Sequence, residues 1–208
     1  MKRQEVARLL FPPQCVLCDE LTESEFSLCG SCWRETHFID GVVCDGCGTP
    51  LPGQDDGHDL LCDDCMTLAR PWAQARAALR YSGNGRRLVL ALKHGDRLDL
   101  VRPAVTWMAS AARPIWRKGM CVVPVPVHWT RLFRRRYNQA AELARGLSDD
   151  LGGVYVPEAL KRIRATPPQD GRGRDARFAN IDGSIVPNSG KSKALTGKEV
   201  WLIDDVMT

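Results

Sequence analysis

The cysteine spacing constrains the fold of this chain more than any other feature of the sequence. Eight cysteines form the four Cys-x-x-Cys pairs Cys15/Cys18, Cys29/Cys32, Cys44/Cys47 and Cys62/Cys65. A two-residue spacing lets one tight turn present two thiolates to the same tetrahedral ion, and two such turns complete a closed structural zinc site. The sequence therefore predicts two four-cysteine zinc ribbons within residues 1–70.

The spacing leaves the pairing order open, since the four pairs can combine either consecutively or in a crossed, RING-like order. A redox pair of the thioredoxin type is disfavoured, because it needs one Cys-x-x-Cys at a helix N-terminus and this chain has four. A segment this short cannot build a large core, so we expect zinc binding to supply its folding free energy. Eight thiolates complete both sites, and we expect His37 and His58 to be surface residues.

Charge is distributed unevenly along the chain. Residues 1–70 contain 5 Lys/Arg and 13 Asp/Glu, whereas residues 71–208 contain 24 Lys/Arg and 12 Asp/Glu. A basic remainder favours polyanionic ligands such as diphosphates or nucleic acids. The acidic zinc module is not expected to bind phosphates directly.

The N-terminal segment lacks the apolar core of a signal peptide, and no stretch of the sequence approaches the length of a membrane span. We therefore expect a cytoplasmic protein without membrane insertion. A reducing compartment agrees with cysteines that bind metal instead of forming disulfides.

Residues 71–208 have the pattern of an α/β domain with a parallel sheet. The expected elements are strands over 76–81, 121–127 and 200–203 and helices over 86–93, 101–112 and 140–151. A basic segment over 161–180 has little periodicity and predicts a loop that closes over an anionic ligand. Strand, basic loop, helix and strand together predict a βαβ unit, whose loops meet at the carboxyl edge of the sheet.

Two adjacent carboxylates, Asp204 and Asp205, follow the apolar run of the last expected strand. Burying both without partners would cost several kcal/mol each, so they need water, a metal ion or hydroxyl groups. By itself such a pair is more typical of an acidic loop or a helix N-cap after an edge strand than of a ligand site. The neighbouring motifs decide between these interpretations.

In their order along the chain, these motifs resemble the ComF family, whose members join a double zinc ribbon to a type I phosphoribosyltransferase-like domain. Some members are linked to natural competence and DNA uptake. One departure is Arg136-Tyr137, which stands where the family usually has Gly-Phe. The resemblance is carried by Leu10–Cys15, the paired four-cysteine module, Leu90–Asp96, Val123–Pro126, Arg135–Ala140, Thr166–Gln169 and Leu202–Val206.

The resemblance implies a site for phosphoribosyl diphosphate in a domain spanning residues 71–208. Asp204 and Asp205 would hold the ribose hydroxyls, directly or through Mg²⁺. Arginines would neutralise the leaving diphosphate, and carboxylates would stabilise the positive charge on the sugar. The implied diphosphate-binding residues are Val125, Pro126, Arg134, Arg135 and Arg136, joined by Arg172, Arg174 and Arg177 of the closing segment. Lys93, Asn138, Gln139 and Thr208 complete the implied substrate-binding set.

Thr208 would be the first residue of the family's 5′-phosphate loop, which continues past the end of the given sequence. We therefore expect the chain as given to have impaired or absent transferase activity. Three hypotheses remain: a phosphoribosyltransferase-like enzyme or binder, a non-catalytic competence factor that binds single-stranded DNA with the same fold, and a zinc-ribbon scaffold that docks competence proteins. The sequence identifies no acceptor for the ribosyl group.

Overall fold

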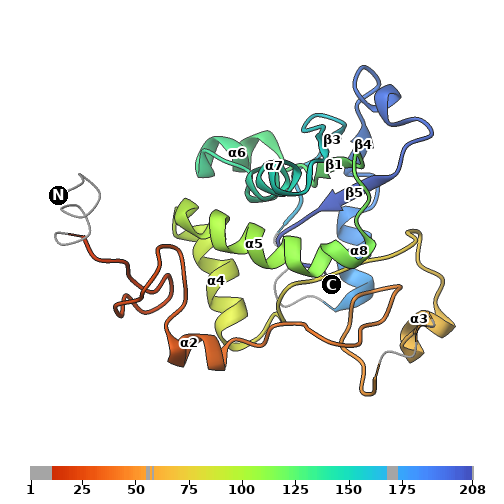
Figure 1. The fold of residues 1–208 in the computed structure, drawn as a ribbon. Helices are drawn as coiled ribbons and strands as arrows, with labels where there is room; N and C mark the ends of the chain where they lie inside the picture. Colours follow the sequence, from red (N-terminus) through yellow and green to blue (C-terminus); the bar gives the residue numbers. More distant parts are fainter. Residues whose placement is uncertain (1–10, 55–56, 58, 168–172, 208) are drawn as a thin grey trace. The chain divides into compact units, whose positions relative to one another are not determined.

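The computed structural model describes residues 11–54, 57, 59–167 and 173–207, which Figure 1 draws in colour. The contacts divide the chain into two compact units, Met1–Ile115 and Trp116–Thr208. The division at residue 70 between a zinc module and a phosphoribosyltransferase-like domain stays a prediction. Within the described ranges, no helix is long and apolar enough to cross a membrane.

The first unit begins with two ribbon turns that share one backbone pattern. The amide of Cys15 donates to the carbonyl of Glu20 over 2.7 Å, and the amide of Cys44 donates to the carbonyl of Thr49 over 2.8 Å. Each turn is followed by a short helix that begins just after a cysteine. The helices of this unit are α2 (Gly30–Glu35), α3 (Asp63–Thr67), α4 (Gly83–His94) and α5 (Val101–Ala112), with single 3₁₀ turns at Leu98–Leu100 and Arg113–Ile115.

The residue four places after the first cysteine of each turn has a positive φ, of 64° at Asp19 and 73° at Gly48. Glycine adopts this conformation without strain, and aspartate is one of the few other residues that tolerate it. Gly46 is needed for another reason, because a Cβ there would lie 3.1 Å from the sulfur of Cys65. The ribbons therefore use the same turn with different residues.

The predicted helices of the first unit are confirmed, and the predicted strand over 76–81 is wrong. Only Leu79 forms an isolated bridge, to Phe38, with two flanking backbone hydrogen bonds. The segment therefore pairs briefly with the chain around Phe38 and joins neither sheet of the described structure. The helix predicted to start at residue 86 already begins at Gly83.

The second unit is built around a three-stranded parallel sheet with the order β2-β1-β5. Its strands are β1 (Cys121–Pro124), β2 (Val154–Tyr155) and β5 (Val200–Ile203). All four residues of the central strand β1 are buried, as expected for a parallel strand covered on both faces. Both the α/β class and the preceding zinc-ribbon module are thus confirmed.

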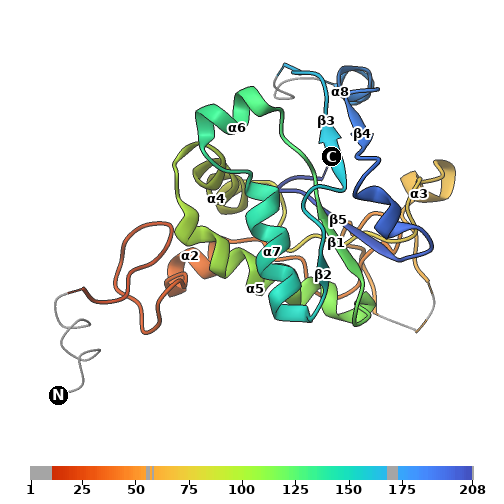
Figure 2. The ribbon, with the colours of Figure 1, turned by 90° about the horizontal axis from the view of Figure 1, so that it is seen from above.

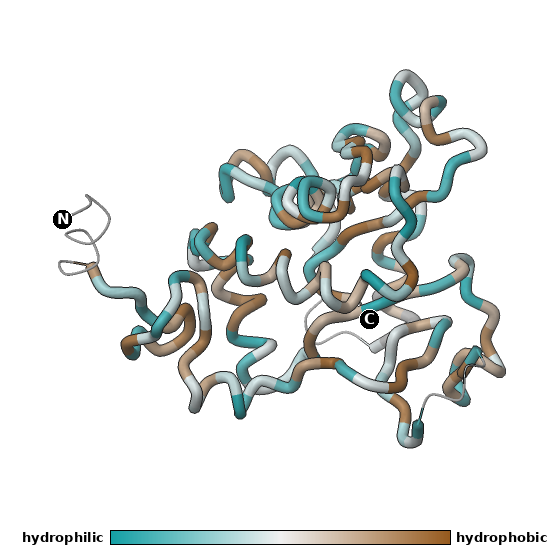
Figure 3. The backbone as a smooth tube through the Cα atoms, viewed as in Figure 1, coloured by the Kyte–Doolittle hydropathy of each residue, from teal (hydrophilic) through white to brown (hydrophobic). Residues whose placement is uncertain are grey.

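Helix α7 (Gln139–Leu151) packs on β1, β2 and β5, and Figure 2 shows it lying along the strands. Its buried residues Leu143, Ala144 and Leu147 recur at helical spacing and form one side of the core. The tube of this helix carries both hydrophobic and hydrophilic colours in Figure 3, as expected of a helix with one face on a sheet and the other in solvent. Helix α6 (Trp129–Arg135) precedes it.

An antiparallel hairpin of β3 (Leu160–Arg162) and β4 (Ile185–Pro187) stands beside this sheet in the second unit. The chain between its strands contains α8 (Arg174–Ile181), and the 3₁₀ turn Ser192–Leu195 follows β4. The segment 161–180 was predicted to be one irregular loop, but it begins within β3 and ends within α8. The prediction is therefore wrong at both ends of the segment. Because β3 and β4 are far apart in the sequence, their pairing produces no local periodic pattern from which either strand could be predicted.

Candidate functional site

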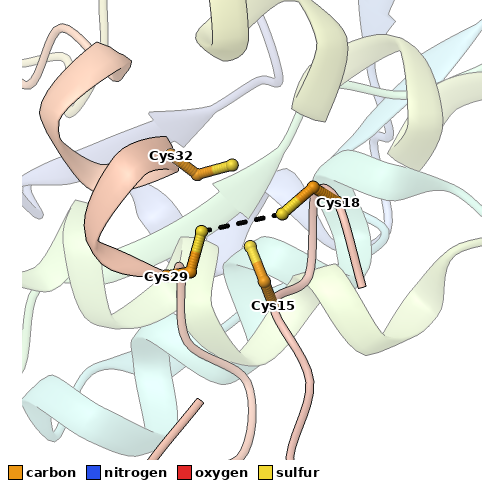
Figure 4. A group of neighbouring side chains, drawn as sticks. All are labelled: Cys15, Cys18, Cys29 and Cys32. Atoms are coloured by element: carbon orange, nitrogen blue, oxygen red, sulfur yellow. Dashed lines mark hydrogen bonds between the residues drawn. The ribbon is translucent and has the colours of Figure 1, made fainter. Parts of the chain in front are cut away.

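The four sulfurs of Cys15, Cys18, Cys29 and Cys32 lie within 4.8 Å of one another. Figure 4 shows the four side chains pointing toward one another, two from the ribbon turn and two from the start of α2, with Cys18 and Cys29 3.6 Å apart. Zn–S bonds of about 2.3 Å in a tetrahedron place sulfurs about 3.8 Å apart. The arrangement fits one structural zinc ion.

A second set of the same kind consists of Cys44, Cys47, Cys62 and Cys65, whose sulfurs also lie within 4.8 Å of one another. The sulfurs of Cys47 and Cys62 are 3.6 Å apart. Each set joins neighbouring pairs along the chain, so the ligands combine consecutively and the crossed alternative is excluded. His37, as expected, is an exposed residue, while His58 lies outside the described residues.

The protonation of the thiols shows why these sites need a cation. Burial raises the pKa of Cys15, but hydrogen bonds from the backbone outweigh burial and bring the pKa to about 7. The same balance brings the pKa of Cys44 to about 7. Burial, followed by hydrogen bonds with Cys18 and Cys29, raises the pKa of Cys32. Cys15 and Cys44 therefore ionise readily whereas Cys32 resists ionisation, and a bound divalent metal reverses that resistance.

Residues just after the second site hold its turn in place. Arg70 Nε lies 3.4 Å from the sulfur of Cys65, and Trp72 Nε1 donates to the carbonyl of Gly46 over 2.6 Å. Arg76 forms a 2.6 Å ion pair with Asp45, and both side chains are largely shielded from solvent. Such contacts to ligands and their turn orient metal ligands in structural sites.

The carboxyl edge of the parallel sheet brings together the ends of β1 and β5. Pro124 pairs with Ile203, and the amide of Val125 donates to the carbonyl of Ile203 over 2.8 Å. The residues that follow both strands therefore lie at one edge, with Val125 and Pro126 on one side and Asp204 and Asp205 on the other. Asp204 is exposed and Asp205 half-buried, and an Asp204 carboxylate oxygen accepts the amide of Asp205 over 2.8 Å.

Two of the predicted substrate-binding residues have structural contacts at this edge. Asn138 caps α7, accepting the amide of Ala140 over 3.1 Å, while its side-chain amide donates to the carbonyl of Val125 over 3.0 Å. Gln139, the first residue of α7, is only 2% exposed. Asn138 therefore fixes the turn after β1 to the start of the helix.

The consecutive arginines of α6 differ in their surroundings. Arg134 and Arg136 are exposed, and Arg136 ends the helix with a left-handed φ of 66°. Arg135 is half-buried. Burial and the nearby Arg131 guanidinium lower the pKa of Arg135, against the attraction of Asp205. Asp205 is thus one of the charged groups that influence Arg135.

Sequence reasoning missed two further arginines at this edge. Arg162, at the end of β3, has Nη1 3.4 Å from the carbonyl of Pro126 and donates Nη2 to Thr166 Oγ1 over 2.8 Å. Arg131 donates to the Thr166 carbonyl. Burial and Arg131 lower the pKa of Arg162, against the attraction of Asp204. The only available signal was that Arg162 lies four residues before the Thr166 motif, amid several other basic residues.

The described structure does not test the remaining predicted site residues. Lys93 lies half-buried in the last turn of α4, in the first unit, and its role stays a prediction. Arg172 and Thr208 lie outside the described residues. Arg174 and Arg177 belong to α8, where the structure describes their backbone. Their roles toward a diphosphate stay predictions.

Comparison with known proteins finds similarity in both parts of the chain. The double zinc ribbon domain family matches residues 6–66. The DNA utilization protein YhgH of Escherichia coli K12 is 27% identical over 96% of this chain and 87% of its own length. Competence protein F of Haemophilus influenzae is 24% identical over 94% of this chain and 85% of its own length.

No solved structure matches the chain significantly. The double zinc ribbon and the similarity over nearly the whole chain agree with the ordered motifs of the sequence. Together these similarities support assignment of the chain to the ComF family.

Proposed function

We propose that the carboxyl edge of β1 and β5 binds phosphoribosyl diphosphate together with Mg²⁺. Asp204 and Asp205 hold the ribose hydroxyls, directly or through the ion. One observation carries the proposal: parallel pairing of β1 with β5 places this carboxylate pair opposite the turn at Val125 and Pro126, with arginines at the same edge. Open α/β sheets bind ligands at such edges, and Mg²⁺ prefers carboxylate and substrate oxygens.

The residues at this edge suit transfer of the ribosyl group to an acceptor. As the acceptor attacks the anomeric carbon, the bond from that carbon to the diphosphate oxygen breaks and the diphosphate leaves with the bonding electrons. Half-buried arginines stabilise the charge that gathers on the leaving group, whereas carboxylates stabilise the positive charge on the sugar. Mg²⁺, when bound, neutralises part of the diphosphate charge.

Calorimetric titration with phosphoribosyl diphosphate and Mg²⁺ tests the proposal. We expect the wild-type chain to bind only when Mg²⁺ is present, and the Asp204→Asn/Asp205→Asn variant to bind at least about tenfold more weakly. A matched control is Asp149→Asn/Asp150→Asn, which neutralises another adjacent pair on the exposed face of α7. A chain extended with the phosphate loop of its relatives is titrated in parallel. Absence of binding by both wild-type forms would contradict the proposal.

A second candidate function is binding of single-stranded DNA along α6. Trp129 and Phe133 are 70% and 87% exposed, and their spacing of four places them on one face of the helix. Exposed Arg134 and Arg136 lie next to them. Aromatic side chains stack on bases and arginines track the phosphates, which is the usual composition of a single-strand binding surface. The relatives named for DNA utilization and competence support this candidate.

Salt dependence distinguishes this candidate from sugar-diphosphate binding. We expect the affinity for a fluorescent oligodeoxynucleotide to fall steeply with ionic strength, and Trp129→Ala/Phe133→Ala to weaken it by about 1–3 kcal/mol per lost base stack. Phe178→Ala removes another exposed aromatic ring, from α8, and serves as the control. Equal affinities of the wild-type and double-variant chains would eliminate α6 as the DNA surface.

A further inference from the structure

Three arginine side chains gather beside the carboxyl edge of the sheet in the second unit. Arg131 and Arg135 lie one turn apart on α6, and Arg162 comes from the end of β3. Thr166, which is only 5% exposed, joins two of them, since its carbonyl accepts from Arg131 and its hydroxyl accepts from Arg162 over 2.8 Å. Two distant segments of the chain are thus linked through one buried residue.

Two of these guanidinium groups retain a buried donor without an acceptor. The Nε atoms of Arg135 and Arg162 are shielded from solvent and have no hydrogen-bond partner within the described part of the chain. Leaving a donor of a charged group unsatisfied in a buried position is costly, and native structures rarely do so without a functional reason. Both guanidinium groups therefore lack an acceptor that a buried arginine donor normally has.

The protein's own carboxylates do not offset the positive charge of the cluster. Asp205 attracts Arg135 and Asp204 attracts Arg162, but in both cases burial and the like charge of Arg131 outweigh this attraction. Like charges held this close destabilise one another unless an anion lies among them. A ligand with several anionic oxygens would supply both the missing charge and the missing acceptors.

We propose that Arg131, Arg135 and Arg162 bind the diphosphate group, with Thr166 fixing the first and last of them. The inference rests on the proposed function and assigns residues to one part of the ligand. Guanidinium groups match phosphate oxygens with paired donors in a fixed plane, so buried arginines give both charge and orientation. The exposed Arg134 and Arg136 are then not required for diphosphate binding.

Binding of inorganic diphosphate in the absence of Mg²⁺ tests this assignment directly. We expect the wild-type chain to bind diphosphate, and Arg162→Gln and Arg131→Gln each to weaken binding at least about tenfold. Arg162→Lys keeps the charge but lacks the planar fork, so it should recover only part of the affinity. Lys161→Gln removes an exposed charge from the same strand and is the matched control. Thermal unfolding of each variant identifies any loss that comes from misfolding.

Equal diphosphate affinity of Arg162→Gln and the wild-type chain, or no diphosphate binding by the wild-type chain, would overturn the assignment. The Asp204→Asn/Asp205→Asn variant separates it from the proposed function. We expect that variant to keep diphosphate binding while losing Mg²⁺-dependent binding of phosphoribosyl diphosphate. A further outcome is that the arginine variants lose diphosphate binding while no form of the chain binds phosphoribosyl diphosphate. In that case the proposed function is wrong and the assignment of the anion site holds.

Discussion

A single added methyl group at Gly153 would disturb the core of the second unit. A Cβ there would lie 2.8 Å from a methyl carbon of Val122 and 2.9 Å from the ring of Trp116. Val122 is fully buried in the central strand and cannot move aside. We expect Gly153→Ala to lower the free energy of unfolding by about 1–3 kcal/mol, measured by urea denaturation.

Gly190→Ala is the control for that substitution, since its Cβ would approach only the Asn188 side chain, at 3.9 Å. The two variants make the same chemical change in a crowded and in an open place. If both lower stability equally, the effect comes from backbone conformation and not from overpacking.

The ion pair of Asp45 with Arg76 predicts a pH dependence in the second ribbon. Burial raises the pKa of Asp45, but the hydrogen bond and charge of Arg76 outweigh it and hold the pKa below its usual range. Stability from this pair is present above the unfolded pKa of about 3.9 and is lost as pH falls through the lower folded value. We expect carbon-13 NMR titration to show this low pKa, and Arg76→Gln to raise it. An unchanged pKa in the variant would contradict the stabilising role.

At the scale of elements, Asn138 joins α7 to the end of β1. Asn138→Ala removes both the cap of the helix and the donor to Val125, and we expect it to lower the free energy of unfolding by about 0.5–2 kcal/mol. Asn138→Asp keeps the capping oxygen and should retain part of this stability. Thermal unfolding of the two variants is the measurement, and equal losses would show that the cap contributes little.

Sequence patterns predicted the elements whose signal is local. The helix over 101–112 has the predicted bounds, and the apolar runs at Cys121 and Val200 became parallel strands. The hairpin of β3 and β4 was missed, because pairing across the α8 segment leaves no pattern in either strand. The segment 76–81 shows the opposite error, since it was predicted to be a strand but forms only an isolated bridge with Phe38.

The two sites differ in the same way, because one is encoded by local spacing and the other by contacts between distant segments. The cysteine spacing contains the geometry of the zinc sites, so their ligands were predicted in full and only the pairing order needed the structure. The carboxyl edge of the sheet brings together residues far apart in sequence. Arg162 was missed because its proximity to Arg131 arises from the shared contact with Thr166, which no local pattern encodes.

At the scale of the molecule, the two units should respond differently to metal removal. All eight zinc ligands belong to the first unit, and the second unit has its own sheet and core. We expect chelation to release two zinc ions per chain and to increase hydrogen exchange in the ribbons, where metal binding supplies folding free energy. Peptides from β1 and α7 should keep their protection.

Hydrogen exchange with mass spectrometry, together with a colorimetric zinc assay, measures both effects. Cys121→Ala is the control for zinc content, because this buried cysteine of β1 belongs to neither four-cysteine set. Loss of protection in β1 at the chelator concentration that opens the ribbons would show that the second unit depends on the metal.

The strand order affects how this protein folds during its translation. The ribbons are completed early in translation, and β1 can pair with β2 soon after α7 emerges. The other edge of β1 stays unpaired until β5, residues 200–203, leaves the exit tunnel. During that interval the nascent chain exposes an apolar strand edge. The carboxylate pair arrives with the same segment, so a growing chain completes the carboxyl edge of the sheet and covers the exposed edge of β1 at the same stage.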